Sequence, residues 1–123
     1  MFGRKENLDH ETILSMFRQV PSLGINTPAG RSHLEETEKT FSQWLEKEDD
    51  NLLGPMRTLA AKNRGVKTLM AEMDQRLGVM ARHVLAFFDR CARGDQGAVS
   101  EPEFGPFLSQ MKETLRWKEK MLF

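Results

Sequence analysis

The feature that most constrains this chain is a run of apolar residues spaced alternately four and three positions apart. These residues are Val66, Met70, Met73, Leu77, Met80, Val84 and Phe87. The spacing extends over three heptads and is typical of helices that pack along one face in bundles and coiled coils. It predicts a helix over residues 66–92, which ends where the glycine-rich segment 93–97 breaks the pattern.

Two further helices are predicted before this seam. The first covers about residues 8–19 and is expected to stop at Pro21, because proline cannot donate the hydrogen bond that continues a helix. The second covers residues 31–63 and is expected to kink at residues 54–55, a Gly-Pro pair. The predicted inward faces are His10, Ile13, Phe17 and Val20 in the first helix, and Leu34, Phe41, Leu45 and Leu52 in the second.

Capping sequences mark the expected helix starts. The second helix has two possible starts, a Thr27-Pro28 cap or a capping box from Ser32 to Glu35. A fourth helix over residues 101–121 follows a capping box from Ser100 to Glu103. Its predicted inward face is Phe104, Leu108, Met111, Leu115 and Leu122, with Lys118 in the same stripe.

Four amphipathic helices with short connections predict an all-α fold, an up-down-up-down four-helix bundle formed by a single domain, residues 1–123. A helical dimer that completes its bundle between two chains is the alternative. No run of alternating β-branched and polar residues indicates a strand.

Composition excludes several classes of function. Lys plus Arg and Asp plus Glu both number 18, so the chain lacks the basic excess with which nucleic-acid binders neutralise phosphates. No apolar run reaches the length of a signal peptide or a membrane span, and we therefore expect a cytoplasmic protein with no membrane partner. The single cysteine, Cys91, excludes an internal disulfide and a cysteine-based zinc site.

Three segments resemble the hemerythrin-like (HHE cation-binding) family. Residues 45–55, Leu-Glu-Lys-Glu-Asp-Asp-Asn-Leu-Leu-Gly-Pro, are similar to a family segment in which an iron-ligating His and Glu precede acidic residues and a Leu-Phe-Pro turn. Residues 115–123 resemble the last helix of the family, and Asp9-His10 resembles its opening histidine. The resemblance follows the order of four helices over most of the chain and implies a bundle that holds two iron ions and binds oxygen.

The chain departs from the family at the metal ligands. Registering the Leu-Gly-Pro turn on the family pattern puts Leu45 and Asp49 at ligand positions, and registering the C-terminal Leu-Phe does the same for Thr114 and Lys118. The family's site takes more histidines than the three in this chain. Its oxygen-binding di-iron chemistry is therefore not expected here.

A reduced metal site remains one interpretation of the polar residues on the inward stripes. It would use His10, Glu48 or Asp49, and His83, because imidazole and carboxylate groups suit iron, manganese or zinc. The alternative is that these residues lie at stripe edges with solvated tips, and that Glu48 forms an ion pair with Lys118, whose ammonium would repel a metal cation.

No catalytic Ser-His-Asp or Cys-His set can be assembled from this sequence. We therefore expect a non-enzymatic bundle without a cofactor that binds another protein or its own copy, and the 8 Met and 8 Phe supply adaptable apolar surfaces. The alternative is a hemerythrin-like, metal- or oxygen-responsive protein with iron in a reduced site. A third hypothesis is a small-ligand or haem binder that uses His83 and neighbouring methionines.

Cys91 has two interpretations. The neighbouring Arg90 and Arg93 favour a lowered thiol pKa and hence a reactive or haem-ligating cysteine. An ordinary structural role, as a small apolar side chain, requires no such reactivity.

Overall fold

The computed structural model of the protein describes the backbone of residues 2–122 and the side chains of residues 10–121. Every regular element in this part of the chain is helical. In chain order the elements are α1 (Phe2–Leu23), α2 (Pro28–Glu48), a π-helical turn (Asp49–Leu53), α3 (Gly54–Ala60), α4 (Arg64–Ala92), a 3₁₀ turn (Gln96–Val99) and α5 (Glu101–Leu122). The predicted all-α bundle is therefore confirmed.

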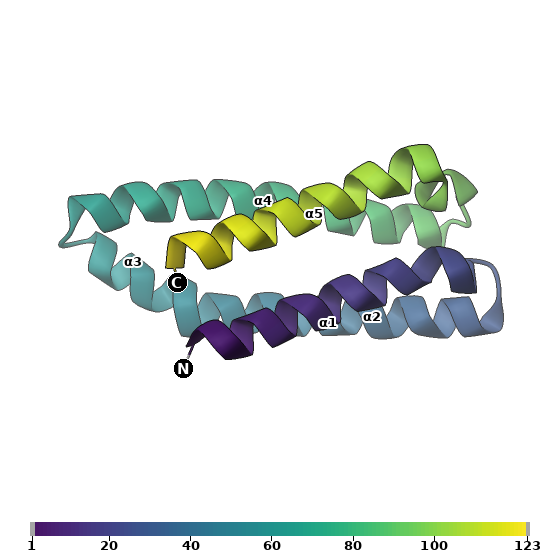
Figure 1. Cartoon of the computed structure of the whole chain (residues 1–123), viewed down its shortest axis with the longest axis horizontal. Helices are drawn as coiled ribbons and strands as arrows, with labels where there is room; N and C mark the ends of the chain where they lie inside the picture. Colours follow the sequence, from purple (N-terminus) through teal and green to yellow (C-terminus); the bar gives the residue numbers. More distant parts are fainter. Residues whose placement is uncertain (1, 123) are drawn as a thin grey trace.

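The helices run up and down along one long axis (Figure 1). α1 and α2 form one antiparallel pair, α4 and α5 form the other, and α1 also packs against α5. α3 joins the two pairs at one end of the bundle, where it and the start of α4 extend past both chain termini (Figure 1). Within the described chain, this end of the molecule is therefore built by α3 and the start of α4.

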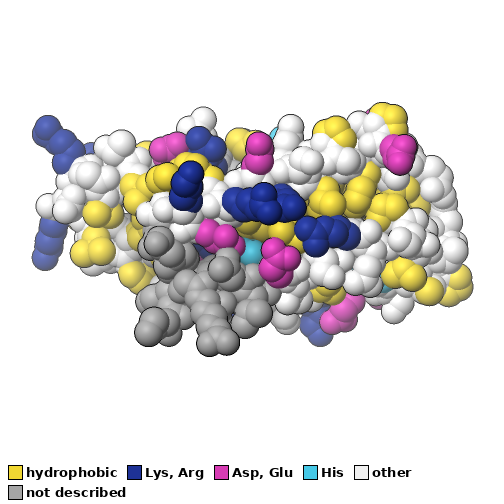
Figure 2. Space-filling model, viewed as in Figure 1, with side chains coloured by type: hydrophobic (Ala, Val, Ile, Leu, Met, Phe, Trp, Pro, Cys, Tyr) yellow, Lys and Arg dark blue, Asp and Glu magenta, His cyan; other side chains and the backbone are white. Residues whose placement is uncertain are grey.

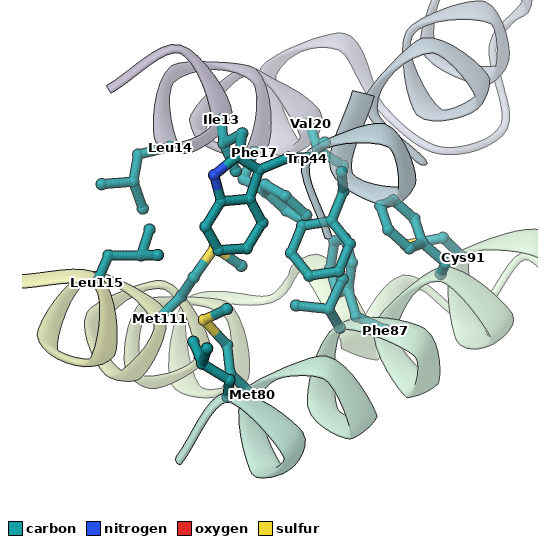
Figure 3. Close-up of a cluster of buried hydrophobic side chains, with 14 of the residues drawn as sticks. Ile13, Leu14, Phe17, Val20, Trp44, Met80, Phe87, Cys91, Met111 and Leu115 are labelled. Carbon is teal, nitrogen blue, oxygen red and sulfur yellow. The ribbon is translucent and has the colours of Figure 1, made fainter. Parts of the chain in front are cut away.

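The core is formed where the predicted apolar stripes meet. Side chains from all four long segments, such as Phe17, Trp44, Phe87 and Met111, point into one shared interior (Figure 3). The seam of α4 is buried as predicted, except that Val66 at its first position is only half-buried. Leu122 of the predicted α5 stripe lies outside the residues whose side chains the structure describes.

α1 runs to Leu23 and not to the predicted stop at Pro21. The helix ends at Gly24, which adopts a left-handed backbone with φ of 83°. The Gly24 N–H donates to the carbonyl of Val20 over 3.0 Å, which is the hydrogen bond of a glycine C-cap. Pro21 sits in the last turn, so the chain ends the helix through the glycine and not through the proline.

The start of α2 follows the first of the two predicted signals. The Thr27 hydroxyl accepts from the backbone N–H of Gly30 over 2.9 Å and donates to the carbonyl of Leu23 over 2.8 Å. The helix therefore begins at Pro28 and not at residue 31, and the Ser32–Glu35 sequence lies inside it, where no cap is needed.

Glycine is required at position 30, in the corner between the end of α1 and the start of α2, because a Cβ there would lie 1.8 Å from the backbone oxygen of Gly24. We expect Gly30→Ala to lower the free energy of unfolding by about 1–3 kcal/mol, the usual cost of overpacking. Gly78→Ala in α4 is the matched control, because a Cβ at Gly78 meets no atom within 4 Å. It should raise stability by about 0.5–1 kcal/mol. Urea unfolding measures both, and equal effects would contradict this account of the corner.

The predicted kink at residues 54–55 begins earlier in the structure. The Gly54 N–H donates to the carbonyl of Asp49, five residues back, so the helix widens into a π turn before Pro55. This wider turn accommodates Pro55, which has no N–H and cannot donate a helical hydrogen bond. α3 then leaves the direction of α2 (Figure 1). α4 begins at Arg64, two residues before the predicted start, behind an Asn63 cap.

The link between α4 and α5 is held by ion pairs and not by the predicted capping box. Arg90 contacts Asp95 at 2.8 Å and Glu103 at 2.7 Å. Ser100 gives its N–H and its hydroxyl proton to the Gly97 carbonyl. Because Glu103 turns to Arg90, it does not reach back to Ser100. The hydrogen bond from Arg90 and that from the Gly97 N–H lower the pKa of Asp95.

Candidate functional site

Three helices bring polar and charged side chains into the core near the end of α2. Lys118 of α5 has no exposed surface, Glu48 of α2 is 4% exposed and His10 of α1 is 1% exposed. Each lies on the inward stripe of its helix, as the sequence predicted. We call His10, Glu48, Lys118 and the neighbouring Glu119 the buried charge cluster.

The groups in this cluster form a directed chain of contacts. The Lys118 ammonium forms an ion pair with the carboxylate of Glu48, and its Nζ lies 3.3 Å from Nε2 of His10. The other ring nitrogen, Nδ1 of His10, lies 2.5 Å from Oε1 of Glu119. Because an ammonium only donates hydrogen bonds, Nε2 must accept, and the ring then carries its proton on Nδ1 and donates to Glu119.

Trp44 covers this cluster on the α2 side. Its ring centroid lies 5.1 Å from Nζ of Lys118, within the range of a cation–π contact, and 5.6 Å from the ring of His10 in an edge-on arrangement. Its Nε1 is buried with no hydrogen-bond partner among the described residues. The Lys118 cation is thus surrounded by a carboxylate, an imidazole acceptor and an aromatic face, and the predicted Glu48–Lys118 ion pair is confirmed. The solvated tips predicted with it are not found for His10 and Glu48, because both side chains are buried.

The residues proposed as metal ligands are not gathered in one place. His10 and Glu48 meet around Lys118, whereas Asp49 is exposed and pairs with Arg57 at 2.9 Å. His83 is exposed on α4 and lines a groove described below. In the described part of the chain, no three His, Cys, Asp or Glu side chains are close enough to hold a metal ion. Because an ammonium lies between His10 and Glu48, these two residues do not fit a metal cation.

A groove lies along the boundary where α4 and α5 pack against each other. Two adjoining hollows of about 450 and 320 Å³ share His83, Phe107 and Gln110. The apolar lining residues are Val79, Met80, Val84, Ala86, Phe87, Ala98, Pro102, Pro106, Phe107 and Met111. The polar ones are Glu72, Gln75, Arg76, His83, Arg90, Glu103, Gln110, Glu113 and Thr114. We call this feature the α4–α5 groove.

The groove has an apolar floor and charged ends. Val79, which lies next to the buried seam of α4 and is not part of it, is 37% exposed and lines the groove. At one end the Arg76 guanidinium lies 4.5 Å from the ring centroid of Trp117 and contacts Glu72 at 3.1 Å. Arg90 and its carboxylate partners flank the other end. The sequence associated His83 with nearby methionines, and Met80 and Met111 indeed line the same groove.

Cys91 is buried, and its environment shifts the thiol pKa in the direction opposite to the one that its arginine neighbours suggested. Its side chain is 1% exposed, and burial raises the pKa of the thiol to about 11, although Arg90 and Arg31 act in the opposite direction. Desolvation disfavours the thiolate more than these two cations favour it. The prediction of a lowered pKa was therefore wrong, because the sequence showed the charges and not the burial.

This burial predicts both reactivity and pH dependence. Cys91 should react with a disulfide reagent at pH 8 only after unfolding. Because its pKa rises on folding from 9.0 to about 11, its contribution to stability is complete below pH 9 and is lost as the pH approaches 11. The difference in stability between the wild type and Cys91→Ala, measured across this range, isolates the thiol. A native thiol that reacts as fast as an unfolded one would contradict this prediction.

No protein-family model, curated protein or solved structure matches the chain. Among the described helices, none combines the length and the apolar composition needed to cross a lipid bilayer.

Proposed function

We propose that this protein is a non-enzymatic interaction module that binds an amphipathic helix of another protein in the α4–α5 groove. Two adjoining hollows, which share three lining residues and follow both helices, carry this proposal. The lining covers residues 72–90 of α4, which is about 27 Å at 1.5 Å per residue. A helix of about 18 residues has the same length, whereas a small ligand prefers a compact pocket that encloses it.

The lining also defines the chemistry of the occupant. Its floor is built from aliphatic, thioether and aromatic side chains, and methionine adapts well to helices of different sequence. Negatively charged carboxylates and positively charged guanidinium groups lie at the ends of the groove. An apolar stripe with mixed charges at its edges would match this surface, which is the helix-in-groove mode of recognition.

Two exposed apolar residues of α4 provide a matched pair of variants. Val79 is 37% exposed and lines the groove, whereas Leu85 is 57% exposed and lies outside it. Val79→Glu introduces a charge on the apolar floor, and Leu85→Glu makes the same change elsewhere on the helix. We expect at least a tenfold loss of partner binding for Val79→Glu, or about 1.4 kcal/mol, and little change for Leu85→Glu.

In the experiment, the tagged wild type, Val79→Glu and Leu85→Glu are each used to capture proteins from cells that produce the chain. The captured proteins are quantified by mass spectrometry. The expected result is a partner held by the wild type and by Leu85→Glu but not by Val79→Glu. Sedimentation velocity of the purified chain tests a second copy as the occupant. If no protein distinguishes the two variants, and the chain is monomeric, the proposal is overturned.

The metal-binding alternative is tested on the same purified sample. We expect no stoichiometric iron, because a metal cation next to Lys118 would be repelled unless the ammonium moved out of the core. Elemental analysis and a visible spectrum taken in air measure this directly. Stoichiometric iron with oxo-bridge absorption would instead favour a hemerythrin-like site.

A further inference from the structure

The end of the bundle built by α3 and the start of α4 carries a local excess of positive charge. Residues 51–71 contain no Asp or Glu, although the chain as a whole is neutral. The same stretch contains the basic residues Arg57, Lys62, Arg64 and Lys67. Figure 2 shows Lys and Arg side chains projecting from this end, with hydrophobic side chains exposed beside them. We call these four residues, together with Leu59, the basic tip.

Most of this charge is not neutralised within the described chain. Arg57 contacts Asp49 at 2.9 Å and Asp74 at 3.5 Å. Lys62, Arg64 and Lys67 are exposed and form no ion pair with any described residue. Three free cations at one end of an otherwise balanced molecule create a positive field that attracts an anionic partner.

Leu59 adds an apolar group to this charged end. It is 58% exposed, more than any other large apolar side chain of the described chain. It lies on α3, within the same hairpin as the three free cations. An exposed leucine among basic side chains is typical of surfaces that meet anionic headgroups and the apolar layer beneath them.

We propose that the basic tip binds the surface of a bilayer that contains anionic lipids, with Leu59 entering the interfacial layer. Such contact requires no membrane-spanning helix. The lack of a long apolar run, from which the sequence predicts no membrane partner, does not exclude such a surface contact. The long axis of the bundle would point outward from the membrane surface, because the tip that contacts the membrane forms one end of that axis (Figure 1).

The shape and chemistry of the tip favour a bilayer over a folded partner. A specific protein interface buries about 800 Å² on each side around an apolar, often aromatic, centre. Here Leu59 is the only large apolar side chain that the described residues of the hairpin expose, whereas a fluid bilayer demands no complementary shape. A nucleic acid would satisfy the cations through its phosphates but would offer no apolar layer to Leu59.

Vesicle sedimentation tests this proposal. The intact chain is mixed with phosphatidylcholine vesicles that contain either about 30% phosphatidylserine or none. Binding is expected only to the anionic vesicles and should weaken as salt is added, because salt screens exposed charges. A triple variant, Lys62→Glu, Arg64→Glu and Lys67→Glu, should lose at least tenfold in affinity.

A second triple variant distinguishes the effect of charge at the tip from the effect of the overall net charge on vesicle binding. Arg18→Glu, Lys39→Glu and Arg82→Glu make the same change of charge at exposed positions on α1, α2 and α4 away from the tip. This variant should keep most of the binding. Equal losses in the two triple variants, or no binding of the wild type to anionic vesicles, would overturn the proposal. Binding to polyglutamate in place of vesicles would overturn it in favour of an acidic protein partner.

Insertion of Leu59 has its own readout, which does not depend on affinity. Leu59→Cys can be labelled with an environment-sensitive fluorophore while the buried Cys91 remains unreactive. A blue shift on anionic vesicles is expected. The same label at residue 85, as Leu85→Cys, should not shift, and equal shifts at both positions would contradict insertion through the tip.

Discussion

Replacing Lys118 with methionine should lower the free energy of unfolding by about 3–5 kcal/mol, the usual cost of breaking a buried ion pair from one side. Methionine fills a similar volume but removes the ammonium that pairs with the buried Glu48 carboxylate. The same change also removes the donor that faces Nε2 of His10. Urea unfolding followed by circular dichroism measures the loss.

A double variant distinguishes lost charge pairing from lost packing. Glu48→Gln together with Lys118→Met removes both charges, so we expect it to recover much of the stability that Lys118→Met alone loses. Arg93→Met is the surface control, because Arg93 pairs with Asp89 at 2.7 Å with both side chains well exposed. That change should cost no more than about 1 kcal/mol. If Lys118→Met costs as little as Arg93→Met, the cluster does not stabilise the core in the way described.

The resemblance to the hemerythrin-like family remains a prediction from the sequence, and Lys118 bears on it. In the register of the C-terminal segment, Lys118 stands where that family is expected to place a ligand. Here its ammonium pairs with Glu48 and contacts His10. We therefore interpret Lys118 as the positive charge that lets polar groups remain buried without a metal. The measurements on Lys118→Met and the elemental analysis test this interpretation from two directions.

The sequence predicted the core well because burial in a bundle follows helical periodicity. The stripe of α1 from His10 to Val20 and the Met- and Leu-rich seam of α4 are buried as their spacing required. Ile25 was missed although it is completely buried, because it lies in a loop and no period marks a loop residue. Trp44 is not among the residues predicted to face inward on α2, yet it is 4% exposed and its ring lies against Lys118.

The candidate sites were harder to predict, because they depend on distances between helices. The stripes placed His10, Glu48 and Lys118 inside, and charge logic suggested the pairing of the last two. Nothing in the sequence indicated that Glu119, one position away from the stripe, would reach His10. The α4–α5 groove could also not be predicted from the sequence, because its width depends on how closely the two helices approach each other. The association of His83 with methionines was the only signal that pointed to it.

The second large effect is expected at Phe17, where we predict that Phe17→Ala will cost about 3–5 kcal/mol. Phe17 is completely buried, and its ring lies 5.5–6.0 Å from four other phenylalanine rings. These are Phe41 of α2, Phe87 and Phe88 of α4, and Phe107 of α5. The side chain of one α1 residue therefore contacts every other long helix, and its removal would leave a cavity that no single helix can close.

The control for Phe17→Ala is Leu85→Ala, which truncates a side chain that is 57% exposed. Its cost should stay within about 0.5 kcal/mol, because an exposed leucine loses little packing. Urea unfolding of both variants gives the comparison, and the slope of the transition should be unchanged if both retain the native fold. A loss below 1 kcal/mol for Phe17→Ala would mean that the helices are held together elsewhere. A loss in the predicted range would identify this aromatic cluster as the contact that unites the two helix pairs, at a level of the bundle separate from the buried charge cluster.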